Sequence, residues 1–223
     1  MLRAYFITFE GGEGSGKTTQ ARLLAHRLEE RPDVSGVVLT HEPAATEAGR
    51  RIWDLIAKGG LDPVAELLLF LADRAQHVAE VIGPALDGGQ VVVCDRFSDS
   101  TVAYQGYGRR LDRRLIRRLT QAATGGLNPD LTILLDLPVE LGLERQGKAA
   151  DAIGREDREF HERVRRGYLE MASRDRDRWA FLDSLRPENE VAEEVWRRVG
   201  PLLERAAGAG ADVTWTPPSS LRG

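Results

Sequence analysis

The sequence is poor in residues that form disulfides or metal clusters. It contains one cysteine and four histidines in 223 residues. A single cysteine excludes a disulfide framework, and Cys94 lies within an apolar run, which is typical of a buried strand residue. The histidines have no metal-ligand spacing. We interpret His26, His77 and His161 as helix-face residues and expect only His41 near a functional site.

Excess positive charge and long apolar segments are also lacking. The formal net charge of −4 argues against a general polyanion-binding protein. No stretch approaches the length of a membrane span, and the first apolar run ends at Glu10, too early for a signal peptide. We therefore expect a cytoplasmic protein with no membrane and no nucleic-acid partner. The arginines between residues 109 and 118 are interleaved with apolar residues that we expect to form a core face, namely Leu111, Leu115, Ile116 and Leu119. This pattern favours a helix with one solvated face over a nucleic-acid site.

The length suits a single domain, predicted over residues 1–205, followed by a Gly-, Ala-, Pro- and Ser-rich disordered tail over residues 206–223. Apolar runs predict strands at residues 5–9, 37–39, 91–94, 131–135 and 179–182. Periodic segments predict helices at about residues 17–30, 48–57, 64–86, 112–124, 139–145, 159–173 and 190–205. The first two strands are expected to be buried, as in a parallel sheet. The predicted fold is α/β: a parallel five-stranded sheet with helices on both faces and a mobile loop over residues 146–155.

A glycine-rich motif follows the first predicted strand and opens a helix. Residues 11–18 match G-x-x-x-x-G-K-T, whose backbone N–H groups form a concave phosphate site. Lys17 is expected to reach the β- and γ-phosphates of a nucleotide, and the Thr18 hydroxyl to bind Mg²⁺. The residues predicted to bind ATP through this loop are Gly11, Gly12, Glu13, Gly14, Ser15, Gly16, Lys17 and Thr18.

Two further pairs of residues are candidates for the same site. Asp95 and Arg96 follow the third predicted strand, where a carboxylate can hold Mg²⁺ and a guanidinium can bind a phosphate. Phe70 and Arg74 lie at i and i+4 on one helix face. That second pair could be ordinary packing, or it could stack on a base and hydrogen-bond to its edge.

Taken together, these segments resemble bacterial thymidylate kinases (dTMP kinases), a family of P-loop nucleoside monophosphate kinases. The resemblance covers about residues 4–200, and the motifs that carry it lie at residues 6–11, 42–43, 70–74, 95–106, 128–132 and 160–164. It implies transfer of the γ-phosphoryl group of ATP to dTMP, giving dTDP and ADP, with Mg²⁺ as the cofactor. It also implies a homodimer.

The resemblance implies roles for individual residues. Phe70 would stack on thymine, and Arg74 would donate to a thymine carbonyl. The remaining substrate-binding residues would be Glu42, Arg96, Ser100, Thr101, Tyr104 and Gln105, with Arg96 on the 5′-phosphate of dTMP. Arg145 would approach the adenine of ATP, and residues 146–156 would form the lid. The expected catalytic residues are Glu13, Lys17, Asp95, Arg96 and Arg155.

The sequence departs from the family pattern in three places. The usual Arg-Glu-Pro-Gly-Gly is His-Glu-Pro-Ala-Ala at residues 41–45, and a phosphate-binding arginine aligns with Trp53, so that Arg50 or Arg51 could replace it. The usual lid arginine is absent from the segment Asp-Ala-Ile-Gly at residues 151–154. Lys148, Arg155 and Arg145 are the candidate lid cations. We favour Arg155, because it lies just before the helix that anchors the lid.

Two other functions remain open from the sequence. One is another P-loop nucleoside or nucleotide kinase, which a panel of substrates distinguishes. The other is a nucleotide-dependent switch or partitioning ATPase. A GTPase should carry Asn-Lys-x-Asp, and Asn128 and Asn189, the only asparagines, are not in that motif. A partitioning ATPase would normally carry an extra lysine early in its P-loop, where this sequence has none.

Overall fold

Five parallel strands form the centre of the computed structural model, which describes residues 4–147 and 152–208. The strands are β1 (Tyr5–Glu10), β2 (Val37–His41), β3 (Val91–Asp95), β4 (Leu131–Asp136) and β5 (Trp179–Asp183). Their order in the sheet is β2-β3-β1-β4-β5, and every neighbouring pair is parallel. The predicted α/β fold with a five-stranded parallel sheet is therefore confirmed.

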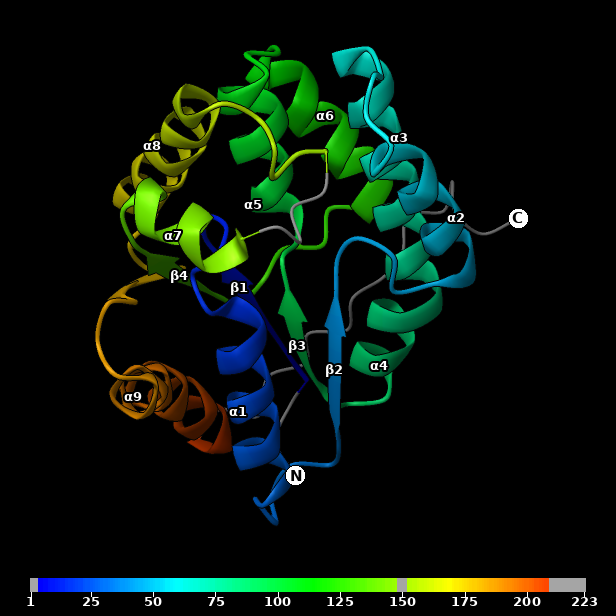
Figure 1. Ribbon diagram of the computed structural model, residues 1–223. Coiled ribbons are helices and arrows are strands. Elements are labelled where there is room, and N and C mark those ends of the chain that lie inside the picture. Colours follow the sequence, from blue (N-terminus) through cyan, green and yellow to red (C-terminus); the bar gives the residue numbers. More distant parts are fainter. Residues whose placement is uncertain (1–3, 148–151, 209–223) are drawn as a thin grey trace.

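One face of the sheet is covered by α1 (Lys17–Glu29) and α9 (Glu188–Gly208), which lie side by side in Figure 1. Side chains alternate between the two faces of a strand. In β1 the side chains of Tyr5, Ile7 and Phe9 accordingly belong to the core shared with these two helices. The same alternation turns the intervening residues of β1, including Glu10, to the opposite face.

The other face of the sheet, towards which Glu10 points, is covered by four helical elements among the described residues. They are α3 (Pro63–His77), the π-helical turn η1 (Val78–Ile82), α4 (Gly83–Asp87) and α8 (Arg158–Arg174). The remaining helical elements lie towards the carboxyl ends of the strands (Figure 1): α2 (Glu47–Ile56), α5 (Ser98–Thr101), η2 (Val102–Gly108), α6 (Arg113–Thr124) and α7 (Val139–Gln146). That edge is where parallel α/β sheets bind ligands. No helix in the described part of the chain is long and apolar enough to cross a membrane.

Two of the expected burial patterns are wrong. β2 is an edge strand, so Leu39 is 44% exposed, whereas we expected this strand to be buried. On α6 it is Ile116 that is fully buried, while Leu115, which we placed on the core face, is 41% exposed. Both differences depend on tertiary neighbours, which an apolar pattern does not specify.

The structure describes only part of the predicted lid and tail. α7 includes Gln146, and residues 152–155 form a turn that leads to α8; residues 148–151 lie outside the described residues. α9 continues to Gly208, beyond residue 205 where we placed the end of the domain. The predicted tail beyond Gly208 lies outside the described residues.

Candidate active site

The glycine-rich loop between β1 and α1 requires glycine at the positions where its backbone turns. Gly11 and Gly14 have φ angles of 145° and 63°, in the region that favours glycine. A Cβ at Gly11 would lie 2.3 Å from the Leu135 carbonyl oxygen, and a Cβ at Gly14 would lie 2.3 Å from the Gly142 carbonyl oxygen. The loop is therefore held against β4 and α7 by backbone contacts that no other residue allows.

Lys17 lies within the concave side of this loop. Its ammonium group donates to the Gly12 carbonyl oxygen at 2.6 Å and to Ser15 Oγ at 3.1 Å. Burial, with the nearby Arg96 guanidinium, lowers the pKa of Lys17 to about 8. A buried cation held by neutral acceptors is well placed to bind a phosphate, whose charge would compensate its own.

Thr18 and Asp95 meet at the carboxyl edge of the sheet, as predicted for a magnesium site. The Thr18 hydroxyl donates to Asp95 Oδ2 at 2.5 Å, and Asp95 Oδ1 is buried without a hydrogen-bond partner among the described residues. Mg²⁺ commonly binds one or two protein oxygens together with waters and substrate phosphates. The unpartnered oxygen therefore fits a magnesium ion that arrives with a nucleotide.

Arg96 lies beside the loop in a backbone conformation unusual for its residue type. Its φ angle is 70°, and its backbone N–H donates to the Phe9 carbonyl oxygen at 2.9 Å. The guanidinium donates to Glu13 at 3.0 Å and to the Gly11 carbonyl oxygen at 3.1 Å. Although burial alone would raise it, Arg96 and Lys17 lower the pKa of Glu13 to about 2. Arg96 is thus fixed with its charge at the loop, where a second phosphate group could bind.

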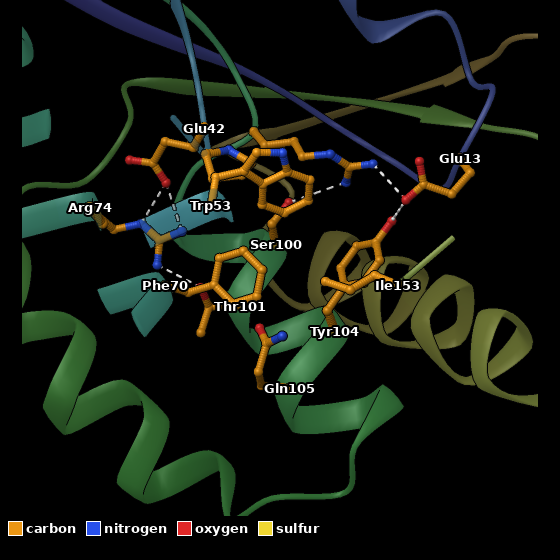
Figure 2. A pocket seen from close by; sticks show the side chains of 12 residues that line it. Glu13, Glu42, Trp53, Phe70, Arg74, Ser100, Thr101, Tyr104, Gln105 and Ile153 are labelled. Atoms are coloured by element: carbon orange, nitrogen blue, oxygen red, sulfur yellow. Dashed lines mark hydrogen bonds and ion pairs between the residues drawn. The ribbon is translucent and has the colours of Figure 1, made fainter. Parts of the chain in front are cut away.

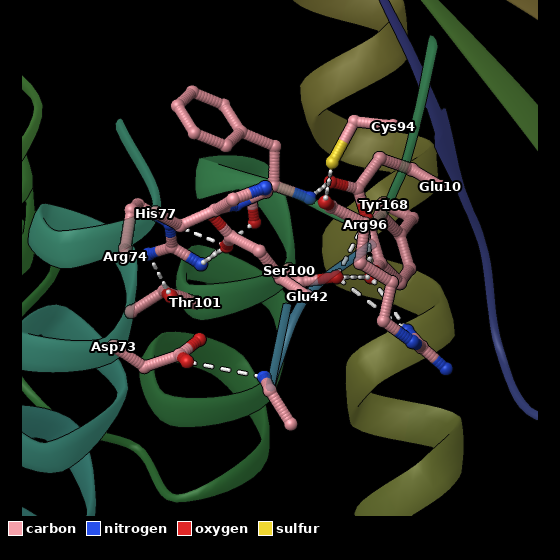
Figure 3. Close-up of polar contacts among 12 residues, drawn as sticks. Glu10, Glu42, Asp73, Arg74, His77, Cys94, Arg96, Ser100, Thr101 and Tyr168 are labelled. Carbon is pink, nitrogen blue, oxygen red and sulfur yellow. Dashed lines mark hydrogen bonds and ion pairs between the residues drawn. The ribbon is translucent and has the colours of Figure 1, made fainter. Parts of the chain in front are cut away.

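Glu10 is a buried carboxylate that sequence reasoning did not place in the site. It accepts hydrogen bonds from the Phe97 backbone N–H at 2.8 Å, from Ser100 Oγ at 2.6 Å and from the Tyr168 hydroxyl at 2.9 Å (Figure 3). Burial and the nearby Asp99 raise the pKa of Glu10 to about 7. These contacts position the segment around Arg96. The sequence feature that could have identified Glu10 is an acidic residue on the core face at the end of an apolar strand.

Glu42 is the centre of a second group of buried charges. It accepts from Arg74 Nε at 2.8 Å and lies 3.0 Å from His77 Nδ1, while His77 Nε2 lies 2.7 Å from Thr40 Oγ1 (Figure 3). Although burial alone would raise it, Arg74 and His77 lower the pKa of Glu42. His77 is thus a fully buried partner of a site residue, whereas we expected a helix-face residue. His41, which we expected near the site, is exposed, and it lies at the end of β2 in register with Asp95.

Ala44 stands where the family pattern has a glycine, and its backbone is held by a hydrogen bond to an aspartate. Ala44 has a φ angle of 76°, and its backbone N–H donates to Asp73 Oδ1 at 3.0 Å. A carboxylate accepting a backbone hydrogen bond can hold a loop in a conformation that glycine would adopt more easily. The turn after Glu42 therefore keeps its shape without the glycine that is usual in the family pattern.

A cavity joins the two groups of charges (Figure 2). Nine residues that we predicted in the site line it, namely Glu13, Glu42, Phe70, Arg74, Arg96, Ser100, Thr101, Tyr104 and Gln105. The structure therefore brings together all of the predicted substrate-binding residues. The lining residues that the sequence did not assign to the site are Pro43, Trp53 and Ile153.

Trp53 and Ile153 close the cavity with apolar groups. Trp53 from α2 points into the cavity alongside Phe70 (Figure 2), and Ile153 reaches it from the lid segment. Arg50 and Arg51 do not replace the arginine that Trp53 displaces, because both pair with Glu47 on the surface and are 59% and 79% exposed. The hypothesis that one of them enters the site is wrong.

The candidate lid cations lie at different distances from this cavity. Arg145 Nη1 donates to the Gly14 carbonyl oxygen at 3.4 Å, so it lies beside the glycine-rich loop. Arg155 is exposed on the turn before α8, and it is not among the residues that line the cavity. Its catalytic role stays a prediction. Lys148 lies outside the described residues.

The arginine run contains one residue that does not lie on a solvated face. Arg109 donates to both carboxylate oxygens of Glu66, at 3.1 and 2.9 Å, and to Glu156 at 2.5 Å. Gln105 Nε2 also donates to Glu66, at 2.9 Å. Sequence reasoning missed Glu66, because its partner lies 43 residues away and no local pattern links the two.

Comparisons with known proteins agree on one family. The model of the family described as thymidylate kinase matches residues 9–195. The chain is 50% identical over 219 residues to the thymidylate kinase of Desulfovibrio desulfuricans, covering 93% of this chain and 100% of that protein. It is 44% identical to the thymidylate kinase of Deinococcus radiodurans, covering 89% of this chain and 98% of that protein.

A solved structure is also similar. The crystal structure of thymidylate kinase from Ehrlichia chaffeensis aligns with a TM-score of 0.74 and 38% identity, covering 88% of this chain and 99% of that one. The family model and the relatives span nearly the whole domain. The chain therefore belongs to the thymidylate kinase family.

Proposed function

We propose that this protein transfers the γ-phosphoryl group of ATP to dTMP, giving dTDP and ADP. The observation that carries the proposal is a single cavity that joins a phosphate-binding loop to a pocket with aromatic and amide side chains. Family membership supports the same reaction. Neither alternative, another nucleotide kinase or a switch ATPase, is favoured by a specific contact in the described residues.

The base end of the cavity has the chemistry that a pyrimidine ring requires. Phe70 and Trp53 offer faces on which a flat base can stack, and Gln105 offers an amide to the edge of the base. Arg74 is buried, with its guanidinium fixed by Glu42 and Thr101. We assign the thymine ring to this end and the sugar to the neighbourhood of Tyr104.

The phosphate end has the charges that phosphoryl transfer requires. Catalysis of this reaction depends mainly on positioning and on neutralising the negative charge of the transferring oxygens. Arg96 would bind the 5′-phosphate of dTMP, Lys17 would bind the β- and γ-phosphates of ATP, and Glu13 would keep Arg96 oriented through their 3.0 Å contact. Ile153 would exclude water from above the acceptor.

Magnesium is the proposed cofactor, held by Thr18 and Asp95. When bound, the ion would neutralise charge on the β- and γ-phosphates. The buried Asp95 Oδ1, which has no partner among the described residues, supports this assignment. Asp95→Asn should raise the Mg²⁺ concentration needed for half-maximal activity, because an amide is a weaker ligand for this ion.

A homodimer in the cytoplasm is the proposed state of the protein. Val64 and Leu68 on α3 are 45% and 50% exposed, and Leu115 on the adjoining helix α6 is 41% exposed. Exposed apolar side chains on neighbouring helices are typical of an interface. Leu68→Glu should shift the protein from dimer to monomer in light scattering. A monomeric wild type would contradict the proposal.

The reaction is tested by a coupled assay of ADP release with ATP, Mg²⁺ and each nucleoside monophosphate in turn. If Phe70, Arg74 and Gln105 form a pyrimidine pocket, dTMP should be the best acceptor and purine monophosphates very poor. Turnover of dUMP should be lower by a modest factor, because one methyl group in an apolar pocket is worth about 1–3 kcal/mol. Equal or better turnover of AMP or GMP would refute the assignment.

A further inference from the structure

The base end of the cavity is backed by a buried polar network that the proposed reaction does not itself use. Glu66 on α3 is 6% exposed and accepts three hydrogen bonds, one from Gln105 and two from Arg109. Arg109 is held in turn by Glu156, at the end of the lid segment, and lies over the Phe160 ring at 4.9 Å. Arg109 is thus fixed from two sides, and it fixes both oxygens of Glu66.

This network determines which end of the Gln105 amide enters the cavity. An ionised carboxylate can only accept hydrogen bonds, so the amide group that faces Glu66 must be the NH₂ donor. Nε2 lies 2.9 Å from Glu66 Oε1, and Gln105 Oε1 takes part in no hydrogen bond among the described residues. Gln105 lines the cavity with its amide next to Phe70 (Figure 2). The Gln105 side-chain oxygen, a hydrogen-bond acceptor, is therefore the atom that faces the cavity.

A fixed acceptor at this place distinguishes pyrimidine bases. Thymine and uracil carry an N3–H donor between two carbonyl groups, whereas cytosine has an unprotonated N3 acceptor beside an amino group. A fixed acceptor can accept a hydrogen bond from N3–H of thymine or uracil, but it faces the lone pair on N3 of cytosine. A buried polar group left without a partner costs about 1–3 kcal/mol.

We propose that Glu66, fixed by Arg109, is a positioning residue that holds the Gln105 amide with its oxygen towards the base, and that this orientation rejects cytosine nucleotides. The inference rests on the proposed function, because it takes the base end of the cavity as the binding place of the acceptor nucleotide. Glu66 itself does not line the cavity, so it acts on the base only through Gln105.

The test uses Glu66→Gln and a matched control, Glu156→Gln. The two changes are chemically the same, and each removes one carboxylate partner of Arg109, but only the first contacts Gln105. A glutamine at position 66 can donate as well as accept, so the Gln105 amide can turn its NH₂ group into the cavity. The quantity measured is the ratio of the inhibition constants of dCMP and dUMP against dTMP, because these two nucleotides differ only at the base edge.

We expect Glu66→Gln to lower this ratio by about tenfold or more, which corresponds to the ~1.4 kcal/mol of one mispaired hydrogen bond. The KM for dTMP should rise more than kcat falls, since the change affects binding of the base. Glu156→Gln should leave the ratio within about threefold of the wild type, which is a small effect on this energy scale. A merely structural role of Glu66 would instead weaken dUMP and dCMP equally.

Thermal denaturation of each variant shows whether it folds. If Glu66→Gln does not fold, the double variant Glu66→Gln/Arg109→Gln removes the unpaired guanidinium and permits the same measurement. A wild-type ratio in a folded variant overturns the inference while leaving the reaction intact. Failure of the wild type to phosphorylate dTMP overturns the proposed function, and the inference with it.

Discussion

The two ends of the cavity compensate their buried charges in different ways. At the base end, each carboxylate is paired within the protein: Glu42 with Arg74 and His77, and Glu66 with Arg109. At the phosphate end Arg96 pairs with Glu13, but Lys17 donates only to neutral acceptors among the described residues, and Asp95 Oδ1 has no partner there. Buried charge without a partner is costly, so the phosphate end is complete only when ligand charges enter.

This difference separates recognition from chemistry. A base carries no net charge, so the side chains that surround it must already be neutralised and oriented before it binds. Phosphates and Mg²⁺ bring charges of both signs. The charged side chains that bind them, such as Lys17 and Asp95, stabilise the reacting groups only once these ligands are bound. Changes at the phosphate end should therefore affect turnover more than changes at the base end, where they should affect the choice of base.

The largest effect is expected for Arg96→Ala. Arg96 is the charge nearest to the acceptor phosphate in the proposed complex, and it also orients Glu13 at 3.0 Å. We expect kcat/KM for dTMP to fall by about 10³-fold, through both KM and kcat, with little change in the KM for ATP. Steady-state kinetics with each substrate varied separately provide the measurement.

The matched variant for this experiment is Arg96→Lys. A lysine retains the charge but not the guanidinium fork, so it should recover only part of the lost activity. Full recovery would mean that charge alone matters at this position. Normal turnover of dTMP by Arg96→Ala would contradict the placement of the acceptor phosphate.

Arg155→Ala tests whether the phosphate end needs a cation from the lid. The glycine-rich loop supplies Lys17 but no arginine, and Ala152 takes the place of the usual lid arginine. As a catalytic cation, Arg155 should be worth about 10²-fold in kcat, with little change in melting temperature, because its side chain is exposed. Arg158→Ala is a suitable control, since Arg158 is 62% exposed and pairs with Glu140 on the surface.

Two outcomes of this comparison are informative. If only Arg155→Ala slows turnover, the lid completes the phosphate end in the closed enzyme. If neither substitution lowers kcat, Arg155 is a surface residue, and the cation must come from Arg145, which lies against Gly14, or from elsewhere in the lid.

The sequence predicted the phosphate end more completely than the base end, for a physical reason. The residues of the glycine-rich loop are contiguous, and Asp95 follows a parallel strand that must end at the same sheet edge, so local patterns place them together. Helix spacing made Phe70 and Arg74 candidates, and family resemblance added their roles and Gln105. His77 and Glu66 were missed because their roles arise from contacts with residues 35 and 39 positions away, in Glu42 and Gln105.

Trp53 and Ile153 show a different limit of sequence reasoning. Both were noted only because they stand where a family arginine or lid motif was expected. Their apolar side chains converge on the cavity in the folded chain, and the pairing of a helix residue with a lid residue 100 positions away follows from packing alone. Comparison with the family motifs therefore drew attention to positions 53 and 153, but it did not predict that their side chains line the cavity.

The smallest expected difference between the phosphate end and the base end is in how ligand affinity depends on pH. Burial and the Arg96 charge lower the pKa of Lys17 to about 8 before a nucleotide binds. Bound ATP phosphates would favour the ammonium form, so above pH 8 ATP must bind together with a proton. The affinity for ATP should then be constant below pH 7 and should fall by up to about tenfold per pH unit above pH 8.

Calorimetry of ATP binding at pH 7, 8 and 9, in buffers of different ionisation enthalpy, measures both the affinity and the protons taken up. We expect uptake to rise towards one proton at pH 9 if Lys17 is the titrating group. Binding of thymidine is the internal control, because thymidine lacks the phosphate that would meet Arg96. The base end has its charges paired within the protein, so the affinity for thymidine should change much less over this range. An ATP affinity that does not vary between pH 7 and pH 9 would show that Lys17 is already held in its charged form without a nucleotide. In that case the phosphate end would be compensated internally, as the base end is, and the contrast between the two ends would be lost.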